Sequence, residues 1–169
     1  MNINTPYRTI TREQFLFNEM RIVASLLSEG KSEKEFTDNA VSILKKIKDA
    51  GFNTIYVHVR PYNDAYYKSK IFPRADYYSD EMNYDPLEII ISEGHKAKLS
   101  VHSWINPLRC QTDAQLKELD NKYIIKQWYD DNSKNGTYII KINDRWYLNP
   151  AYEEVRNYVA DGVLSLIHI

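Results

Sequence analysis

The sequence of 169 residues lacks several features that would assign it to a specialised class of protein. It has one cysteine, Cys110, which excludes an intramolecular disulfide, and this residue is interpreted as a bystander rather than a nucleophile. The 22 basic and 23 acidic residues nearly cancel, so the composition favours neither nucleic acid nor an anionic membrane as a partner. No apolar run reaches the length of a membrane span. Charges such as Arg8, Arg12 and Glu13 also interrupt the N-terminal region where a secretory apolar segment would lie.

Period-two alternation predicts two β-strands of one design, at residues 55–61 and 99–107. One face of each segment is aliphatic, and each run ends at a proline, which cannot donate a ladder hydrogen bond. The opposite face carries, in chain order, Tyr56, His58, Arg60, Ser100, His102, Trp104 and Asn106. A helical pattern lies between the two segments, so together they predict a βαβ unit and an α/β fold.

Capping patterns predict where helices begin and end. Ser32 and Glu35 form a capping box, and the helical spacing that follows ends at Gly51. Asp85 and Pro86 open a second helix as N-cap and first helical residue. Other segments are predicted as a buried strand (20–27), a long loop (61–84), a weakly helical stretch (108–136), a hairpin (137–142 with 145–148) and a last helix capped by Asn149 before Pro150.

The carboxyl ends of the two strands are the expected place for a site, because parallel α/β folds bind ligands there. Arg60 can bind a carboxylate or sugar hydroxyls, and the Trp104 ring can form the floor of a sugar subsite. Asp64 and Arg109 follow the same strand ends in the chain. The alternative is structural, with Arg60 and Asp64 paired and the strand histidines satisfied inside the core.

Other site chemistries have weaker patterns in this sequence. His58, His102 and Asp64 are the residue types that bind zinc or iron, but no His-x-His or His-x-x-x-His spacing accompanies them. A Ser-His-Asp hydrolase lacks its Gly-x-Ser-x-Gly elbow. Glycoside hydrolysis uses two carboxyl groups, and only Asp64 lies near a strand end.

Several blocks occur in the chain in the order of a known family. They are Glu19–Arg21, Val59–Pro61 with Asp64–Ser69 and Phe72–Pro73, Tyr84–Leu87, His102–Arg109, and Trp146–Pro150 with Val155–Arg156. This pattern resembles the family 10 glycosyl-hydrolase-like proteins of bacteria, and the His-x-Trp-x-Asn-Pro block is its most specific part. His58, Lys98, Ser103 and Leu108 depart from the family's usual Gln, Gly, Ala and Tyr.

The resemblance implies a TIM-type (β/α)8 barrel of which about the first three βα units are present. The expected division is a lead-in (1–18), the N-terminal part of the barrel (19–163) and a non-native tail (164–169), because the last six residues read like a translated sequencing adapter. The family's next strand supplies acidic residues, so the catalytic acids are expected beyond Val163 and His168 is left out of the site.

The expected function is hydrolysis of O-glycosyl bonds in a bacterial glycan, with peptidoglycan-type strands first and no cofactor or metal. Arg60 and Asp64 are assigned to polar sugar groups and Trp104 to stacking. The residues assigned to orientation are His102, Asn106, Arg109 and, with less support because helix capping already explains it, Asn149. A non-catalytic carbohydrate-binding protein and a metal-dependent hydrolase remain the alternatives. As written, the chain is expected to be cytoplasmic; the family is commonly exported, which implies the cell envelope or secretion if the native start lies upstream.

Overall fold

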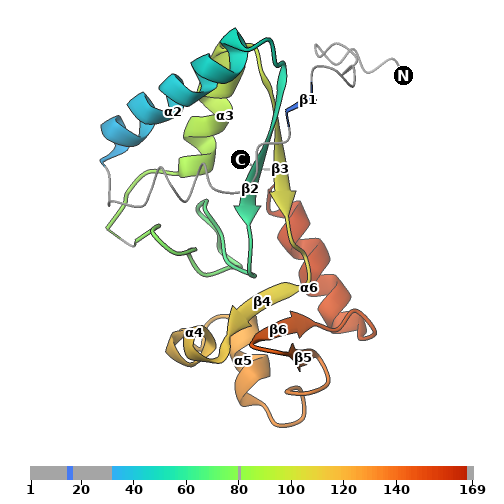
Figure 1. Cartoon of the computed structure of the whole chain (residues 1–169). Coiled ribbons are helices and arrows are strands. Elements are labelled where there is room, and N and C mark those ends of the chain that lie inside the picture. Colours follow the sequence, from blue (N-terminus) through green and yellow to red (C-terminus); the bar gives the residue numbers. More distant parts are fainter. Residues whose placement is uncertain (1–14, 17–31, 80, 167–169) are drawn as a thin grey trace.

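The computed structural model describes residues 15–16, 32–79 and 81–166. A parallel sheet holds, in spatial order, β1 (Phe15–Leu16), β2 (Thr54–Arg60) and β3 (Ser100–Ile105). Two helices lie on the same side of β2 and β3 in Figure 1, namely α2 (Glu33–Asp49) and α3 (Pro86–Lys96). The predicted βαβ unit and the α/β class are therefore confirmed.

The pairing of β2 with β3 confirms the predicted alternation of faces. Tyr56 lies opposite His102 and His58 opposite Trp104, so the polar and aromatic side chains of the two strands share one face. Ile55, Val57 and Val59 point the other way and are buried. The register shifts between His58 and Arg60, which bends the strand at its carboxyl end.

Both predicted helix starts are confirmed by their caps. The Ser32 hydroxyl accepts a hydrogen bond from the Glu35 backbone N–H at 3.3 Å, and the Glu35 carboxylate accepts one from the Ser32 N–H at 3.0 Å. At α3 the Asp85 carboxylate accepts from the Leu87 N–H at 2.9 Å. The side of α2 that enters the core consists of Phe36, Ala40, Leu44 and Ile47.

The long segment between β2 and α3 is packed into the core by its aromatic residues. The buried rings in it are Tyr66, Tyr67, Phe72, Tyr78 and Tyr84. The segment is also tied to α3, because the Lys68 N–H donates to the Asp85 carboxylate at 2.7 Å. Much of the tyrosine content of this segment therefore has a packing role.

A second, antiparallel sheet follows β3. Its strands, in spatial order, are β4 (Arg109–Thr112), β6 (Arg145–Leu148) and β5 (Ile139–Ile142). The helices of this part are α4 (Asp113–Glu118), α5 (Ile124–Asp130) and α6 (Glu153–Leu164), and α6 runs back towards the end of β3 (Figure 1). The predicted hairpin is confirmed, whereas the stretch predicted as weakly helical contains β4 as well as two helices.

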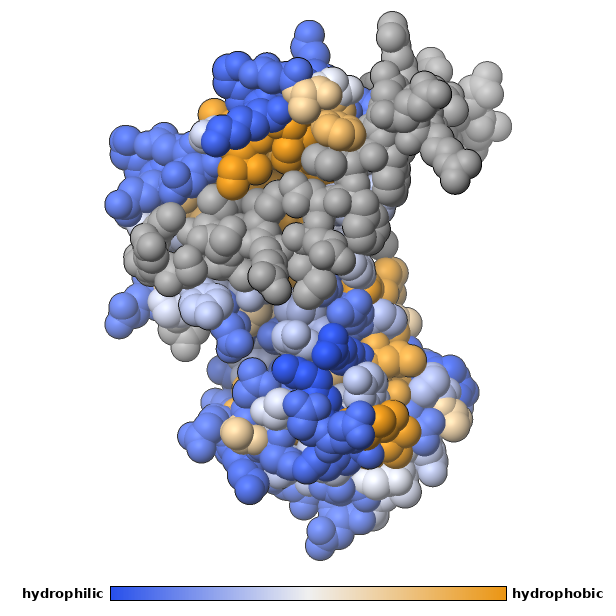
Figure 2. Space-filling model, in the orientation of Figure 1, coloured by the Kyte–Doolittle hydropathy of each residue, from blue (hydrophilic) through white to orange (hydrophobic). Residues whose placement is uncertain are grey.

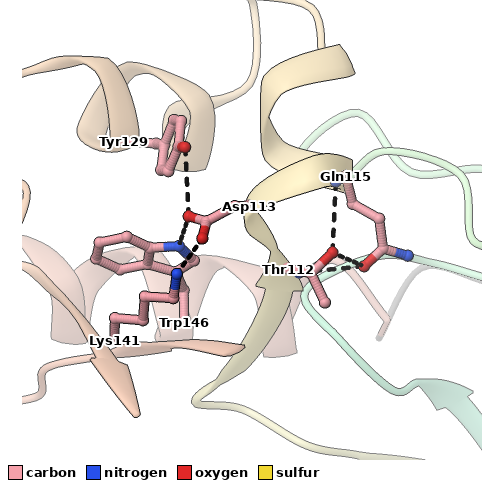
Figure 3. A network of polar contacts seen from close by, with 6 residues as sticks. All are labelled: Thr112, Asp113, Gln115, Tyr129, Lys141 and Trp146. Atoms are coloured by element: carbon pink, nitrogen blue, oxygen red, sulfur yellow. Dashed lines mark hydrogen bonds and ion pairs between the residues drawn. The ribbon is translucent and has the colours of Figure 1, made fainter. Parts of the chain in front are cut away.

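A polar network holds β4 and α4 onto the hairpin (Figure 3). The Asp113 carboxylate accepts hydrogen bonds from the Trp146 indole at 2.8 Å and the Tyr129 hydroxyl at 3.3 Å, and it pairs with Lys141. These interactions hold the pKa of Asp113 below its usual range, with the Lys141 hydrogen bond as the largest cause. The network therefore fixes the strand that starts at Arg109.

Three expectations need correction or lie outside the described residues. The last helix begins at Glu153 with Tyr152 at its N-cap position, so Asn149 does not cap it. A two-residue strand, β1, lies in the predicted lead-in, and the strand predicted at 20–27 lies outside the described residues. Within the described residues the strands form two three-stranded sheets of a mixed α/β structure.

The surface seen in Figure 2 is mostly hydrophilic, and the hydrophobic residues visible on it form small separate areas. The large hydrophobic side chains that are exposed are Val41, Tyr77, Ile142, Tyr152, Val163 and Leu164. No helix in the described part of the chain is long and apolar enough to cross a membrane.

Candidate functional site

Four rings form a stacked ladder across β2 and β3. Tyr56 stacks on His102 with the ring centroids 5.0 Å apart, and His58 stacks on Trp104 at 4.5 Å. The arrangement follows from the sequence, because alternation places these residues on one face and the register sets them directly opposite each other. His102 is exposed and Trp104 is partly exposed, so part of the ladder is accessible at the surface.

His58 is the buried member of the ladder and is uncharged at neutral pH. Only 2% of it is exposed, and its Nε2 atom makes no hydrogen bond within the described residues. Burial, together with the smaller effect of the nearby Arg109 charge, lowers the pKa of His58 to about 4. A neutral imidazole beneath Trp104 can donate one hydrogen bond and accept another but carries no charge for an ion pair.

Asp64 is a buried carboxyl group with a shifted protonation equilibrium. It is 5% exposed and accepts a hydrogen bond from the Tyr62 backbone N–H at 2.9 Å. Burial, together with the smaller effect of the Asp76 charge, raises the pKa of Asp64 to about 6. A carboxyl group with a pKa near neutrality can donate or accept a proton, which is a property of catalytic acids. The influence of Asp76 on Asp64 was not predicted from the sequence.

Arg60 does not reach the surface of the site. Its side chain is fully buried, with the guanidinium 4.1 Å from the centre of the Phe72 ring. Its three guanidinium nitrogens make no well-formed hydrogen bond within the described residues. Burial raises the pKa of the nearby Tyr67 hydroxyl, and the Arg60 charge opposes this rise. The alternative pairing with Asp64 is also absent from the ion pairs of the described residues.

Asn106 and Arg109 connect the strand ends to the loops that surround them. The Asn106 backbone N–H donates to the Arg60 carbonyl at 2.9 Å, and its side-chain amide donates to the Pro61 carbonyl at 3.2 Å. Asn106 therefore holds the turn after β2 in place. Arg109 lies with its guanidinium 4.9 Å from the centre of the Tyr62 ring.

Asn149 lies apart from these residues, on the hairpin side. Its amide donates to the Thr137 carbonyl at 2.9 Å, and its side-chain oxygen accepts from the Ala151 N–H at 3.2 Å. These contacts give Asn149 a structural role in joining β6 to the turn before α6.

The loop after β2 is fixed by residues that the sequence did not indicate. Asn63 adopts a positive φ of 63°, its amide donates to the Tyr158 hydroxyl at 3.0 Å, and its carbonyl accepts from the Gln111 amide at 3.1 Å. Positive φ in a non-glycine residue is uncommon and is maintained here by contacts from β4 and α6. The contact between Tyr62 and Arg145 was also not predicted. The Arg145 guanidinium lies 3.9 Å from the centre of the Tyr62 ring.

No group of three His, Cys, Asp or Glu side chains within residues 15–16, 32–79 and 81–166 is arranged to hold a metal ion. The metal-dependent alternative therefore gains no support from this part of the chain. Cys110 is fully buried, and burial raises its thiol pKa, so it packs as a small apolar residue.

Comparison with known proteins gives a family and two named relatives. The model of the family described as Glycosyl hydrolase-like 10 matches residues 17–168. Glycosyl hydrolase YngK of Bacillus subtilis (strain 168) is 26% identical over 144 residues, which are 82% of this chain and 27% of YngK. Glycosyl hydrolase DigH of Escherichia coli (strain K12) is 28% identical over 131 residues, which are 73% of this chain and 30% of DigH. The chain thus spans less than a third of the length of these relatives.

Proposed function

The chain belongs to the glycosyl hydrolase-like 10 family, and we propose from this membership that it binds a bacterial glycan and that the whole protein hydrolyses O-glycosyl bonds. The observation that carries the proposal is the ring ladder ending at Trp104, because flat aromatic rings bind the apolar faces of sugars. Peptidoglycan-type strands are the substrate class we assign. The names of YngK and DigH, both glycosyl hydrolases, support the reaction class.

The fold that we propose for the whole protein is a TIM-type barrel. The parallel order β1–β2–β3 is compatible with the first strands of such a barrel, and the ladder lies on one face of its sheet. In such a barrel the side chains that contact substrate come from the carboxyl ends of the strands. Arg60 is the last residue of β2 and the Asp64 loop follows it, while Asn106 follows the end of β3.

The residues divide into direct and indirect roles in this proposal. Trp104 stacks on a sugar ring, His102 orients it, and Asp64 exchanges a proton or hydrogen bond with a hydroxyl. Asn106 acts indirectly through the Pro61 carbonyl, and the fully buried Arg60 supports the loop from below. Asn149 remains outside this set because both of its contacts are local to the hairpin.

The catalytic acids are proposed to lie beyond Val163. Glycosidases of either stereochemistry place two carboxyl groups across the scissile bond, about 5–10 Å apart. Asp64 is the one buried carboxylate at the described strand ends, so the second group has to come from another strand. The non-native origin of residues 164–169 stays a prediction; α6 includes Leu164, and residues 167–169 lie outside the described residues.

The proposal is tested by binding and by hydrolysis. Titration calorimetry of the 169-residue chain with peptide-free peptidoglycan strands should show binding that Trp104→Ala weakens by about tenfold, which corresponds to about 1.4 kcal/mol. Trp104→Phe, which keeps a ring, should retain most of the affinity. Tyr152→Ala removes an exposed ring at the start of α6 and serves as the control without effect.

Hydrolysis is measured on the reading frame obtained by sequencing past codon 163. Release of new reducing ends from the same strands, followed by mass spectrometry, supports the hydrolase. Binding without release supports the carbohydrate-binding alternative, which the single buried carboxylate of the described site favours. Absence of binding by both proteins contradicts the proposed function.

A further inference from the structure

Two arginines from the antiparallel sheet contact the same tyrosine ring, Tyr62. Tyr62 follows β2, Arg109 is the first residue of β4, and Arg145 is the first residue of β6. The guanidinium of Arg145 lies 3.9 Å and that of Arg109 lies 4.9 Å from the centre of the Tyr62 ring. The two arginines start from opposite ends of the antiparallel β4–β6 pair, and their contacts with one ring bring both positive groups beside Tyr62.

The two guanidinium groups have almost no acceptors of their own. Every ion pair between described residues uses a lysine, so neither Arg109 nor Arg145 is paired with a described carboxylate. Arg145 makes one long hydrogen bond, 3.5 Å, to the Cys110 carbonyl, and the buried Nε of Arg109 makes none. Each guanidinium carries five N–H donors, so most of this donor capacity is available to a ligand.

The arginine pair is continuous with the proposed sugar surface. Arg109 lies close enough to His58 for its charge to be felt there, and the His58 ring lies 4.5 Å from that of Trp104. The buried Asp64 feels the Arg145 charge but makes no ion pair with it among the described residues. A ligand that stacks on Trp104 would therefore have a positively charged neighbour on the β4–β6 side.

We infer that Arg109 and Arg145 bind a carboxylate carried by a sugar of the glycan, and that this pair selects acidic over neutral glycans. The inference rests on the proposed function and names the substrate class of the same site. A carboxylate has two oxygens that match the forked donors of a guanidinium, and hydrogen bonds between charged partners are about twice as strong as neutral ones. A neutral glycan would leave both positive groups without an anionic partner.

Three ligands test the inference on the 169-residue chain by titration calorimetry. They are peptide-free peptidoglycan strands, which carry a lactyl carboxylate on alternate sugars, the same strands with these carboxylates reduced to alcohols, and chitohexaose, which has none. We expect the first ligand to bind at least tenfold more tightly than the other two, and added salt to weaken only the first.

The double variant Arg109→Gln/Arg145→Gln should bind all three ligands with the affinity of the neutral ones. Arg156→Gln is the matched control, because Arg156 is exposed on α6 and its hydrogen bonds to described residues go to the Pro150 and Ala151 carbonyls. The comparison of intact with reduced strands on the unchanged protein is independent of whether the double variant folds.

The outcomes separate the two proposals. Equal affinity of the unchanged protein for all three ligands overturns the carboxylate inference and leaves glycan binding intact. A carboxylate preference that persists in a folded double variant overturns the assignment to these arginines. If none of the three ligands binds, the proposed function itself fails.

Discussion

Two polar clusters border β4, and they differ in how their groups are satisfied. On the side of the hairpin, Asp113 is partly exposed and has three partners, one of them a lysine of opposite charge (Figure 3). On the side of β2, a second cluster lies beneath the loop that follows this strand. It contains buried polar atoms with no hydrogen bond within the described residues. Those atoms belong to His58, Arg60, Asn63, Tyr67, Arg109 and Gln111.

This difference distinguishes polar groups that stabilise the fold from polar groups that are available for a function. Buried polar groups in folded proteins are usually hydrogen-bonded, because an unsatisfied group costs about 1–3 kcal/mol. The Asp113 network obeys this rule and accounts for the position of β4. The cluster around Arg60 lies next to the proposed site and contains unsatisfied buried groups. Ligands, water or further protein groups complete hydrogen-bond networks of this kind.

The largest expected effect comes from Asp64. Its pKa rises from 3.8 to about 6 on folding, so the unfolded chain releases this proton first as the pH rises. The free energy of unfolding is therefore highest below pH 3.8, and it decreases by about 3 kcal/mol as the pH rises to 6. Asp64→Asn removes this loss and keeps an acceptor for the Tyr62 N–H. Denaturant unfolding between pH 4 and pH 7 measures the change.

His58 makes the Asp64 experiment sharper, because its pH dependence has the opposite sign. Its pKa falls from 6.5 to about 4 on folding, so its contribution to stability is lost as the pH falls through this range. In Asp64→Asn the His58 effect stands alone, and the free energy of unfolding should decrease on acidification from pH 7 to pH 4. A pH profile identical to that of the unchanged protein would contradict the shifted pKa of Asp64.

Arg60→Met should stabilise the chain by about 2 kcal/mol at neutral pH. The substitution removes a buried charge without a well-formed hydrogen bond and retains an apolar side chain against Phe72. Arg60→Lys, which keeps the charge and loses the planar stacking, is the matched control and should lower stability. Loss of stability in Arg60→Met would show instead that the guanidinium has an essential partner, and would remove the contrast between the two clusters.

Asp113→Asn should lower the free energy of unfolding by about 1 kcal/mol, the smallest of the three effects. The amide can still accept from the Trp146 indole, whereas the ion pair with Lys141 is lost from a partly exposed position. Lys141→Met measures the ion pair alone and should cost less. If Lys141→Met were as costly as Asp113→Asn, the amide would accept from the indole as strongly as the carboxylate does, and the ion pair would account for the whole effect. Thermal unfolding followed by circular dichroism measures both variants.

Local patterns predicted the parts of the molecule that depend on neighbours in sequence. Alternation in residues 55–61 and 99–107 predicted which faces of β2 and β3 are aliphatic, and two capping patterns predicted where α2 and α3 begin. The prediction that Asn149 caps the last helix failed because an Asn-Pro pair is also compatible with a tight turn. Hydrogen bonds of the Asn149 side chain with Thr137 and Ala151 favour the turn. The strand β4 was missed because its four residues carry no alternation long enough to recognise.

The sequence by itself determined the α/β class, the family resemblance and the presence of a polar, aromatic face on two parallel strands. Only the tertiary structure decided which of those side chains are accessible, burying Arg60 and His58 while leaving His102 and Trp104 at least partly exposed. It also brought Arg145 to Tyr62 through the return of β6 beside β4. The physical reason is that burial and charge proximity depend on packing between segments distant in the chain, which no local period or cap encodes.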